Sequence, residues 1–139
     1  MVSYSTNVRA SLETVWQHFI YKIEHPENFV PGVSNVVIKE RAPDFIIRDM
    51  DIVLPDGAKT TVSEKITHFP YCVKFLIIDH PIYSGHVDNI AERISDNETK
   101  ITFALHWVNK KTGEPFSNED VAKKAVQKTA DYILQHNQI

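Results

Sequence analysis

The middle of the chain, residues 33–109, consists of short segments in which apolar and polar residues alternate, separated by turn-forming residues. This alternation is typical of β-strands with one buried face. Strands joined by such short turns run antiparallel, because a parallel neighbour needs a long crossover connection. The stretch therefore predicts a series of antiparallel strands. We expect these strands at residues 33–41, 45–54, 60–69, 71–78, 85–95 and 100–108.

Helical patterns flank this series only at its two ends. Residues 2–10 alternate and predict a first strand, and Ser11 can cap a helix that Pro26 ends before a short second helical turn. After the strands, residues 117–136 form a long amphipathic segment with Ser117 as the expected cap. Strands grouped apart from helices predict an α+β fold. Seven antiparallel strands are expected to wrap around the long C-terminal helix, with two short helices after the first strand.

Length and charge limit the classes of protein that fit. The 139 residues are expected to form a single domain, 1–139. The net charge is −3, and Lys and Arg are spread along the chain, so no nucleic-acid surface is expected. No apolar run approaches the length of a membrane span. The start of the chain does not resemble a signal segment, and the one cysteine, Cys72, fits a reducing compartment, so we expect a cytoplasmic location.

Three polar side chains lie in phase with apolar neighbours on three different predicted strands. These are Arg48, Glu64 and Asn89. Side chains two positions apart share one face of a strand, so all three fall on faces that otherwise resemble core. An unpaired charge there would cost several kcal/mol. Arg48 and Glu64 are therefore expected to pair, with Asn89 nearby, beneath Thr129 and Tyr132 of the closing helix.

Two interpretations of this polar group remain open. It is either a buried ion pair that only fixes strand register, or the polar end of an apolar pocket, the usual composition of a small-molecule site. In the second case Arg48 holds a carboxylate, enol or phenolate oxygen, and Glu64 acts as a general base if burial raises its pKa more than Arg48 lowers it. The expected ligand-binding residues are Asn89, Trp107, Met50, Phe75, Phe103, Ala125, Thr129 and Tyr132.

Other chemistries have less support in the sequence. The seven histidines show no spacing typical of a metal site, so no metal and no cofactor are expected. Cys72 lies out of phase with the apolar face of its strand and is interpreted as an inert packing residue. His136 is expected to cap the last carbonyls of the closing helix.

One predicted strand, residues 71–78, is apolar on both faces. Leu76 and Ile78 fall on the face that points away from the core, where a strand half exposed to water normally carries polar residues. Either a neighbouring loop covers them, or a second copy of the chain does so in a homodimer.

Several local motifs resemble those of a known family. The matching pieces are Trp16, residues 22–31 (KIEHPENFVP), Arg48, Glu64, residues 87–90 (VDNI), residues 102–107 (TFALHW), Ala125, Val126 and Thr129. In order and spacing they resemble the AtaL-like family of the START-like, or SRPBCC, superfamily, over nearly the whole chain. The resemblance implies the helix-grip (Bet v 1-like) fold. The family takes its name from a fungal secondary-metabolite cluster, and its superfamily includes polyketide cyclases, lipid carriers and hormone receptors.

The residues and the resemblance together predict a protein that binds a small apolar or aromatic, polyketide-like ligand in an internal pocket. Two functions remain open. One is a cofactor-independent cyclisation, dehydration or isomerisation in secondary metabolism, with Glu64 as base and Arg48 as oxyanion partner. The other is non-catalytic binding or carriage of a hydrophobic ligand or lipid. Catalysis requires Glu64 to titrate near the working pH and to reach the ligand, whereas carriage requires only volume.

Overall fold

The computed structural model describes residues 1–54 and 56–136. In chain order the elements are β1 (Val2–Val8), α1 (Leu12–Glu24), the 3₁₀ helix η1 (Pro26–Asn28), β2 (Ser34–Arg41), β3 (Ile46–Val53), β4 (Lys59–Phe69), β5 (Cys72–Asp79), β6 (Tyr83–Ser95), β7 (Glu98–Asn109) and α2 (Glu119–His136). Within the described residues, seven strands form one antiparallel sheet in the order β1-β7-β6-β5-β4-β3-β2. The predicted α+β helix-grip architecture is confirmed.

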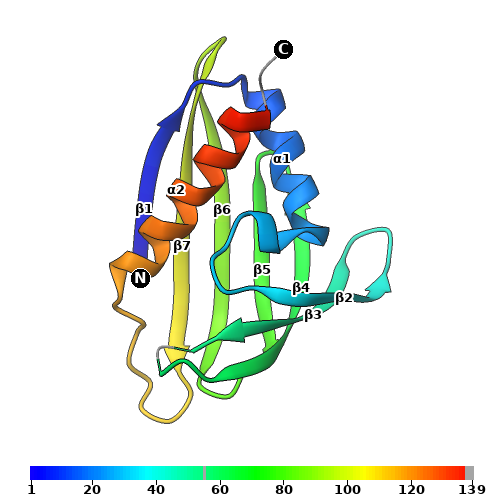
Figure 1. Ribbon diagram of the computed structural model, residues 1–139, viewed down its shortest axis with the longest axis vertical. Coiled ribbons are helices and arrows are strands. Elements are labelled where there is room, and N and C mark those ends of the chain that lie inside the picture. Colours follow the sequence, from blue (N-terminus) through cyan, green and yellow to red (C-terminus); the bar gives the residue numbers. More distant parts are fainter. Residues whose placement is uncertain (55, 137–139) are drawn as a thin grey trace.

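The sheet is strongly curved, and both long helices lie on its concave side (Figure 1). From β2 to β7, each strand pairs with the next one in the sequence. The first strand, β1, pairs with the last, β7. The helix α2 packs on β1 and β7, and α1 packs on β6 and β7. In Figure 1, β2 and β3 sweep across the lower half of the molecule, where α2 has not yet begun. The helices therefore cover one end of the concave face more completely than the other.

The hydrophobic core fills the covered end. Ser11 begins α1 as predicted, because its hydroxyl accepts a hydrogen bond from the backbone N–H of Thr14 at 3.2 Å. The apolar stripe of α1 then meets side chains of α2 and of the central strands. The fully buried members include Val15, Phe19, Ile23, Ile101, Val126 and Ile133.

The closing helix begins one residue later than the sequence predicted. Asn118, rather than Ser117, caps it, since the Asn118 side-chain oxygen accepts a hydrogen bond from the backbone N–H of Asp120 at 3.0 Å. On this helix Ala130 is buried, whereas His136 is exposed. The expected cap by His136 is present, because its Nδ1 lies 2.8 Å from the carbonyl oxygen of Tyr132.

The outer face of β5 carries the two apolar residues that raised the question of a second copy. Leu76 and Ile78 are 41% and 52% exposed, so no loop among the described residues covers them. The homodimer remains a prediction. Within the part of the chain that the structure describes, neither helix combines the length and apolar character needed to cross a membrane.

Phe19 offers a test of this core. Its side chain is fully buried and meets the ring of Phe103 edge to face, with 6.2 Å between ring centres. Phe19→Ala should lower the free energy of unfolding by about 3–5 kcal/mol, because it removes buried apolar contacts and leaves a cavity. Val37→Ala, on the exposed face of β2, should change it by less than about 0.5 kcal/mol. Urea denaturation measures both, and equal effects would contradict the described packing.

Candidate functional site

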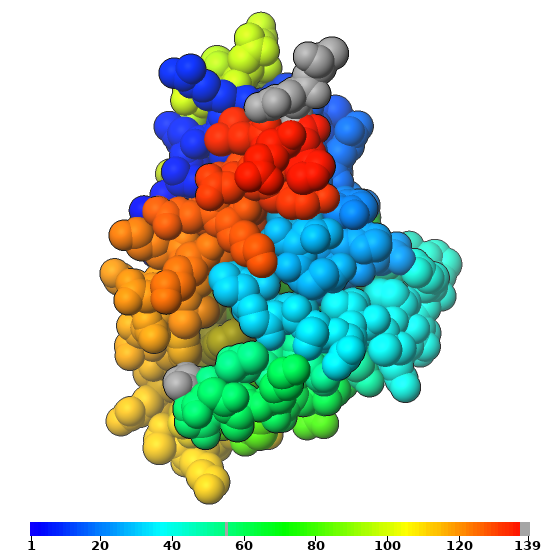
Figure 2. Space-filling model, viewed as in Figure 1, coloured from blue at the N-terminus to red at the C-terminus, as the bar shows by residue number. Residues whose placement is uncertain are grey.

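A cavity of about 360 Å³ lies at the less covered end of the concave face. Its walls come from β3 to β7, from the chain that follows η1 and from the start of α2. Figure 2 shows the surface hollowed between the start of α2 in orange, the segment after η1 in cyan and the end of β3 in green. The cavity exists because α2 begins only at Glu119, so its side chains do not fill this half of the sheet.

Most of the site residues predicted from the sequence meet around this cavity. The polar group and its apolar neighbours line it together: Arg48, Glu64, Asn89, Met50, Phe75, Phe103, Trp107 and Ala125. Those on strands share one face of the sheet, as the alternation in the sequence predicted, and Ala125 faces them from α2. Their roles in binding or catalysis stay predictions.

Thr129 and Tyr132 do not line the cavity. The hydroxyl of Thr129 is buried and lies 3.5 Å from the carbonyl oxygen of Phe29. The ring of Tyr132 stacks on His136 and packs against Phe29, on the other side of the helix layer. The prediction that the polar group lies beneath these two residues is therefore wrong. The reason is that α2 crosses the sheet at an angle, so only its first turns, including Ala125, face the cavity.

Arg48 and Glu64 form the expected ion pair. They are directly opposite one another in the β3–β4 register, and Nη2 of Arg48 donates to Oε1 of Glu64 at 2.8 Å. Both side chains are almost fully buried, with 3% and 7% exposed. The Nη1 group of Arg48 donates instead to the carbonyl oxygen of Ile23, and lies 3.4 Å from that of Lys22. Arg48 thus connects the end of α1 to the sheet, a contact that the sequence did not reveal.

Lys22 is the most unusual residue in the cavity, and it was not among the predicted site residues. Its Nζ donates to the side-chain oxygen of Asn89 and lies 4.0 Å from the centre of the Phe103 ring. Burial, together with the nearby Arg48 charge, lowers the pKa of Lys22 to about 7 against the smaller opposing effect of Glu64. A signal was present, because helical spacing places Lys22 in the same buried stripe as Phe19.

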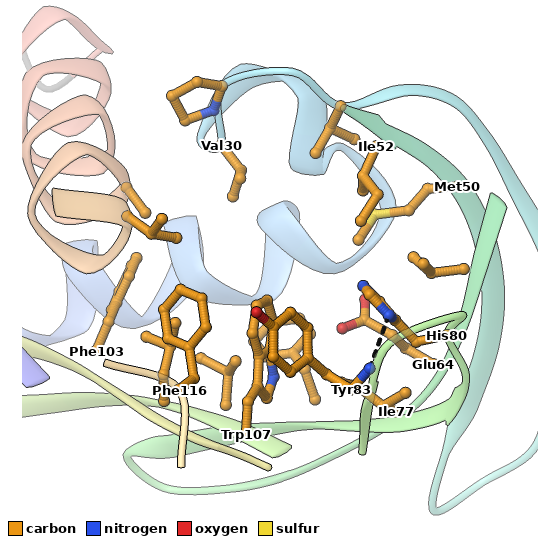
Figure 3. A pocket seen from close by; sticks show the side chains of 18 of the residues that line it. Val30, Met50, Ile52, Glu64, Ile77, His80, Tyr83, Phe103, Trp107 and Phe116 are labelled. Atoms are coloured by element: carbon orange, nitrogen blue, oxygen red, sulfur yellow. Dashed lines mark hydrogen bonds between the residues drawn. The ribbon is translucent and has the colours of Figure 1, made fainter. Parts of the chain in front are cut away.

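His80 is a second missed residue, in the loop between β5 and β6. Its buried ring accepts hydrogen bonds at Nδ1 from the backbone N–H groups of Ile82 and Tyr83, at 3.0 and 3.1 Å. Because Nδ1 accepts, the proton of the neutral ring is on Nε2. Burial, aided by Lys110, lowers the pKa of His80, while Glu64 opposes this shift. In Figure 3 the ring lies beside Glu64 at the cavity wall. A loop residue carries no periodic signal, so sequence alone could not place it.

An aromatic cluster forms the wall next to His80 (Figure 3). Trp107 stacks on Tyr83 with 5.6 Å between ring centres and meets Phe116 edge to face at 5.3 Å. Gly85, opposite Trp107 in the β6–β7 register, has a φ of +112°, and a Cβ there would lie 2.0 Å from the carbonyl oxygen of His106. Only glycine therefore lets β6 approach β7 closely enough to hold this wall.

Three N–H donors of cavity residues have no acceptor among the described residues. They are Nε of Arg48, Nδ2 of Asn89 and Nε1 of Trp107, and all three atoms are buried. A buried donor without a partner costs about 1–3 kcal/mol. A ligand that brings oxygen acceptors to this wall would remove that cost. The cavity is thus apolar over most of its surface, and its buried donors without acceptors among the described residues come from β3, β6 and β7.

A separate group of possible metal ligands lies on the outer face of the sheet. His86, Asp88 and His106 place one donor atom each within 4.8 Å of one another, although the sequence predicted no metal. Both imidazole Nε2 atoms lie near Oδ2 of Asp88, at 3.5 and 3.6 Å. Lys74 is directly opposite Asp88 in the β5–β6 register, so this outer face also carries a lysine next to the group. This group faces away from the cavity and contributes nothing to it.

The fold defines a helix-grip protein of the START and Bet v 1 type. A family model described as "Acetylaranotin biosynthesis cluster protein L" (AtaL) matches residues 5–138. The chain therefore belongs to the AtaL family. No curated protein matches it in sequence.

Solved structures share the fold at low sequence identity. The Zhui aromatase/cyclase from Streptomyces sp. R1128 is 14% identical with a TM-score of 0.68, over 98% of this chain and 85% of that one. The protein TTHA0849 from Thermus thermophilus is 10% identical with a TM-score of 0.74, over 99% of both chains. Human STARD10 is 15% identical with a TM-score of 0.74, over 97% of this chain and 63% of that one. At these identities the likeness concerns the fold.

The low pKa of Lys22 makes stability depend on pH. Folded Lys22 releases its proton at about pH 7, whereas the unfolded chain keeps it up to the ordinary lysine value of 10.5. The folded state binds fewer protons between these values, so stability rises with pH across that interval. We expect the wild type to gain stability relative to Lys22→Met from about pH 7.5 to about pH 9.5, by at most about 1.4 kcal/mol per pH unit.

Urea denaturation at several pH values measures this difference. Lys124→Met serves as the control, because Lys124 is exposed on α2. The control should follow the wild type at every pH. A constant difference between wild type and Lys22→Met over the whole interval would show that Lys22 keeps its proton in the folded protein.

Proposed function

We propose that the protein binds a small, largely apolar molecule with oxygen acceptors, of aromatic or polyketide-like character, in the cavity between the sheet and α2. One observation carries this proposal: an apolar cavity contains buried N–H donors, on Arg48, Asn89 and Trp107, that have no acceptor among the described residues. Small-molecule sites have this composition, in which apolar walls supply affinity and a few polar groups fix orientation.

The walls suit a flat, apolar ligand. Phe75, Phe103 and Trp107 contribute aromatic faces, and Met50 adds a flexible apolar side chain that adapts to irregular shapes. The cavity, at about 360 Å³, lies within the usual range for small-molecule sites. An aromatase/cyclase has this fold, which supports a polyketide-like ligand, and a START protein has it as well.

The cavity opens to the surface, as a site for a ligand taken up from outside the protein requires. The hollow in Figure 2 lies between the start of α2 and the end of β3. Val53 and Val121 line the cavity there and are partly exposed, at 47% and 41%. An apolar rim of this kind lowers the cost of moving an apolar ligand from water into the cavity.

Proton transfer on the bound ligand is a second candidate function. The observation that favours it is the set of titratable groups at the polar end: Glu64, His80 with its proton on Nε2, and Lys22 with a pKa of about 7. General acid–base catalysis works best when the pKa lies near the working pH. Arg48 has less freedom to hold an oxyanion than the sequence suggested, because Nη1 and Nη2 already donate to Ile23 and Glu64, which leaves Nε and the second N–H of Nη2.

Filling the cavity tests ligand binding directly. Ala125 lines the cavity from α2, so Ala125→Trp should occupy space that the ligand needs. We expect this variant to lose at least about 10-fold in affinity for a fluorescent naphthalene probe, the loss that corresponds to about 1.4 kcal/mol. The measurement is a fluorescence titration of the probe, followed by competition with natural product extracts.

The neighbouring position supplies the control. Lys124 precedes Ala125 on the exposed side of α2, so Lys124→Trp adds the same side chain outside the cavity. It should bind the probe as the wild type does. Equal probe binding by wild type, Ala125→Trp and Lys124→Trp would place the probe elsewhere and refute the proposed site.

A further inference from the structure

We propose that Lys22 forms a reversible imine with an aldehyde or ketone group of the ligand, and thereby selects apolar carbonyl compounds. This inference rests on the proposed function, because the carbonyl must first be held in the cavity. Neither the sequence motifs nor the similar proteins assign a role to Lys22.

The Lys22 amine is enclosed by apolar and amide groups. Its Nζ lies 4.0 Å from the centre of the Phe103 ring and 5.2 Å from that of Phe75. Its hydrogen-bond partner among the described residues is Oδ1 of Asn89. Among residues 1–54 and 56–136, no carboxylate oxygen lies within 4.0 Å of Nζ of Lys22. A carboxylate partner would hold the amine protonated and unreactive, so its absence leaves the nitrogen able to react.

A second cation beside the amine favours the neutral form. Burial and the Arg48 charge both disfavour an ammonium group, and Glu64 compensates only partly because it pairs with Arg48. The Phe103 face favours the ammonium form, since aromatic faces attract cations. Burial, Arg48 and Glu64 together leave a pKa of about 7, so a large share of the amine is neutral at neutral pH. Desolvation and a neighbouring cation are the two devices that activate nucleophilic lysines.

The reaction balances with the groups that are present. The neutral Nζ attacks the carbonyl carbon, a C–N bond forms, and the carbonyl oxygen takes up the proton that the nitrogen releases. Loss of the resulting hydroxyl together with the second proton of the nitrogen, as water, leaves a C=N bond, with no oxidant or reductant involved. Asn89 assists at both ends, because Oδ1 accepts from the amine and Nδ2, which has no acceptor among the described residues, is free to donate to the carbonyl oxygen.

Reductive trapping tests the imine. The wild type is incubated at about pH 7 with 2-naphthaldehyde and sodium cyanoborohydride, and the product is examined by intact mass measurement and peptide mapping. We expect one adduct, whose added mass is that of the probe less one oxygen atom, on the peptide that contains Lys22. Its yield should exceed that at any other lysine by at least about 10-fold and rise from about pH 6 to about pH 8, as a pKa of about 7 requires.

Two variants and the peptide map of the labelled wild type show whether Lys22 carries the adduct. Lys22→Met should lose the selective adduct, while Lys124→Met should keep it, with circular dichroism reporting whether each variant folds. The peptide map of the wild type locates the adduct even if Lys22→Met does not fold. Labelling spread over surface lysines, with Lys22 unmodified, would overturn the proposal.

A probe without a carbonyl group separates this inference from the proposed function. Binding of 2-naphthalenemethanol is followed by quenching of tryptophan fluorescence, because Trp107 lines the cavity. If the alcohol binds and the aldehyde leaves Lys22 unmodified, the imine is refuted and the ligand-binding function stands. If neither compound binds in the cavity, both proposals fail.

Discussion

The guanidinium group of Arg48 joins three parts of the molecule at one buried point. It pairs with Glu64 across the β3–β4 register and donates to the carbonyl oxygen of Ile23 at the end of α1. A buried charge is tolerated only while its partners remain in place. The end of α1 is therefore held at a defined position over the sheet. The cavity depends on this contact, because it holds α1 and the β3–β4 pair together at the polar wall.

The position of α1 determines the chemistry of the cavity. With its last turn held by Arg48, Lys22 points inward, bonds to Asn89 and lies beside a second cation. The late start of α2 leaves the space that these groups face. An interior with unpaired donors and a desolvated amine is costly for stability. Such cost is typical of a functional site rather than of a core that only stabilises the fold.

The sequence predicted what depends on local periodicity. The two-residue period of strands placed Arg48, Glu64 and Asn89 on one face, because a strand has only two faces to choose between. Thr129 was misplaced because the angle at which α2 crosses the sheet depends on packing along the whole helix. Lys22 was missed because its charge suggested exposure, although its helical position lies within the apolar stripe. His80 was missed because loop residues follow no period. The catalytic roles assigned to Glu64 and Arg48 remain predictions.

The role of Arg48 as a connection between α1 and the sheet can be measured in one double variant. Glu64→Leu alone should lower the free energy of unfolding by about 3–5 kcal/mol, because it leaves Arg48 buried without its partner. Adding Arg48→Met removes that charge and should recover part of the loss. The double variant should still be about 1–3 kcal/mol less stable than the wild type, because the carbonyl oxygen of Ile23 loses its donor. A double variant as stable as the wild type in urea denaturation would contradict this account.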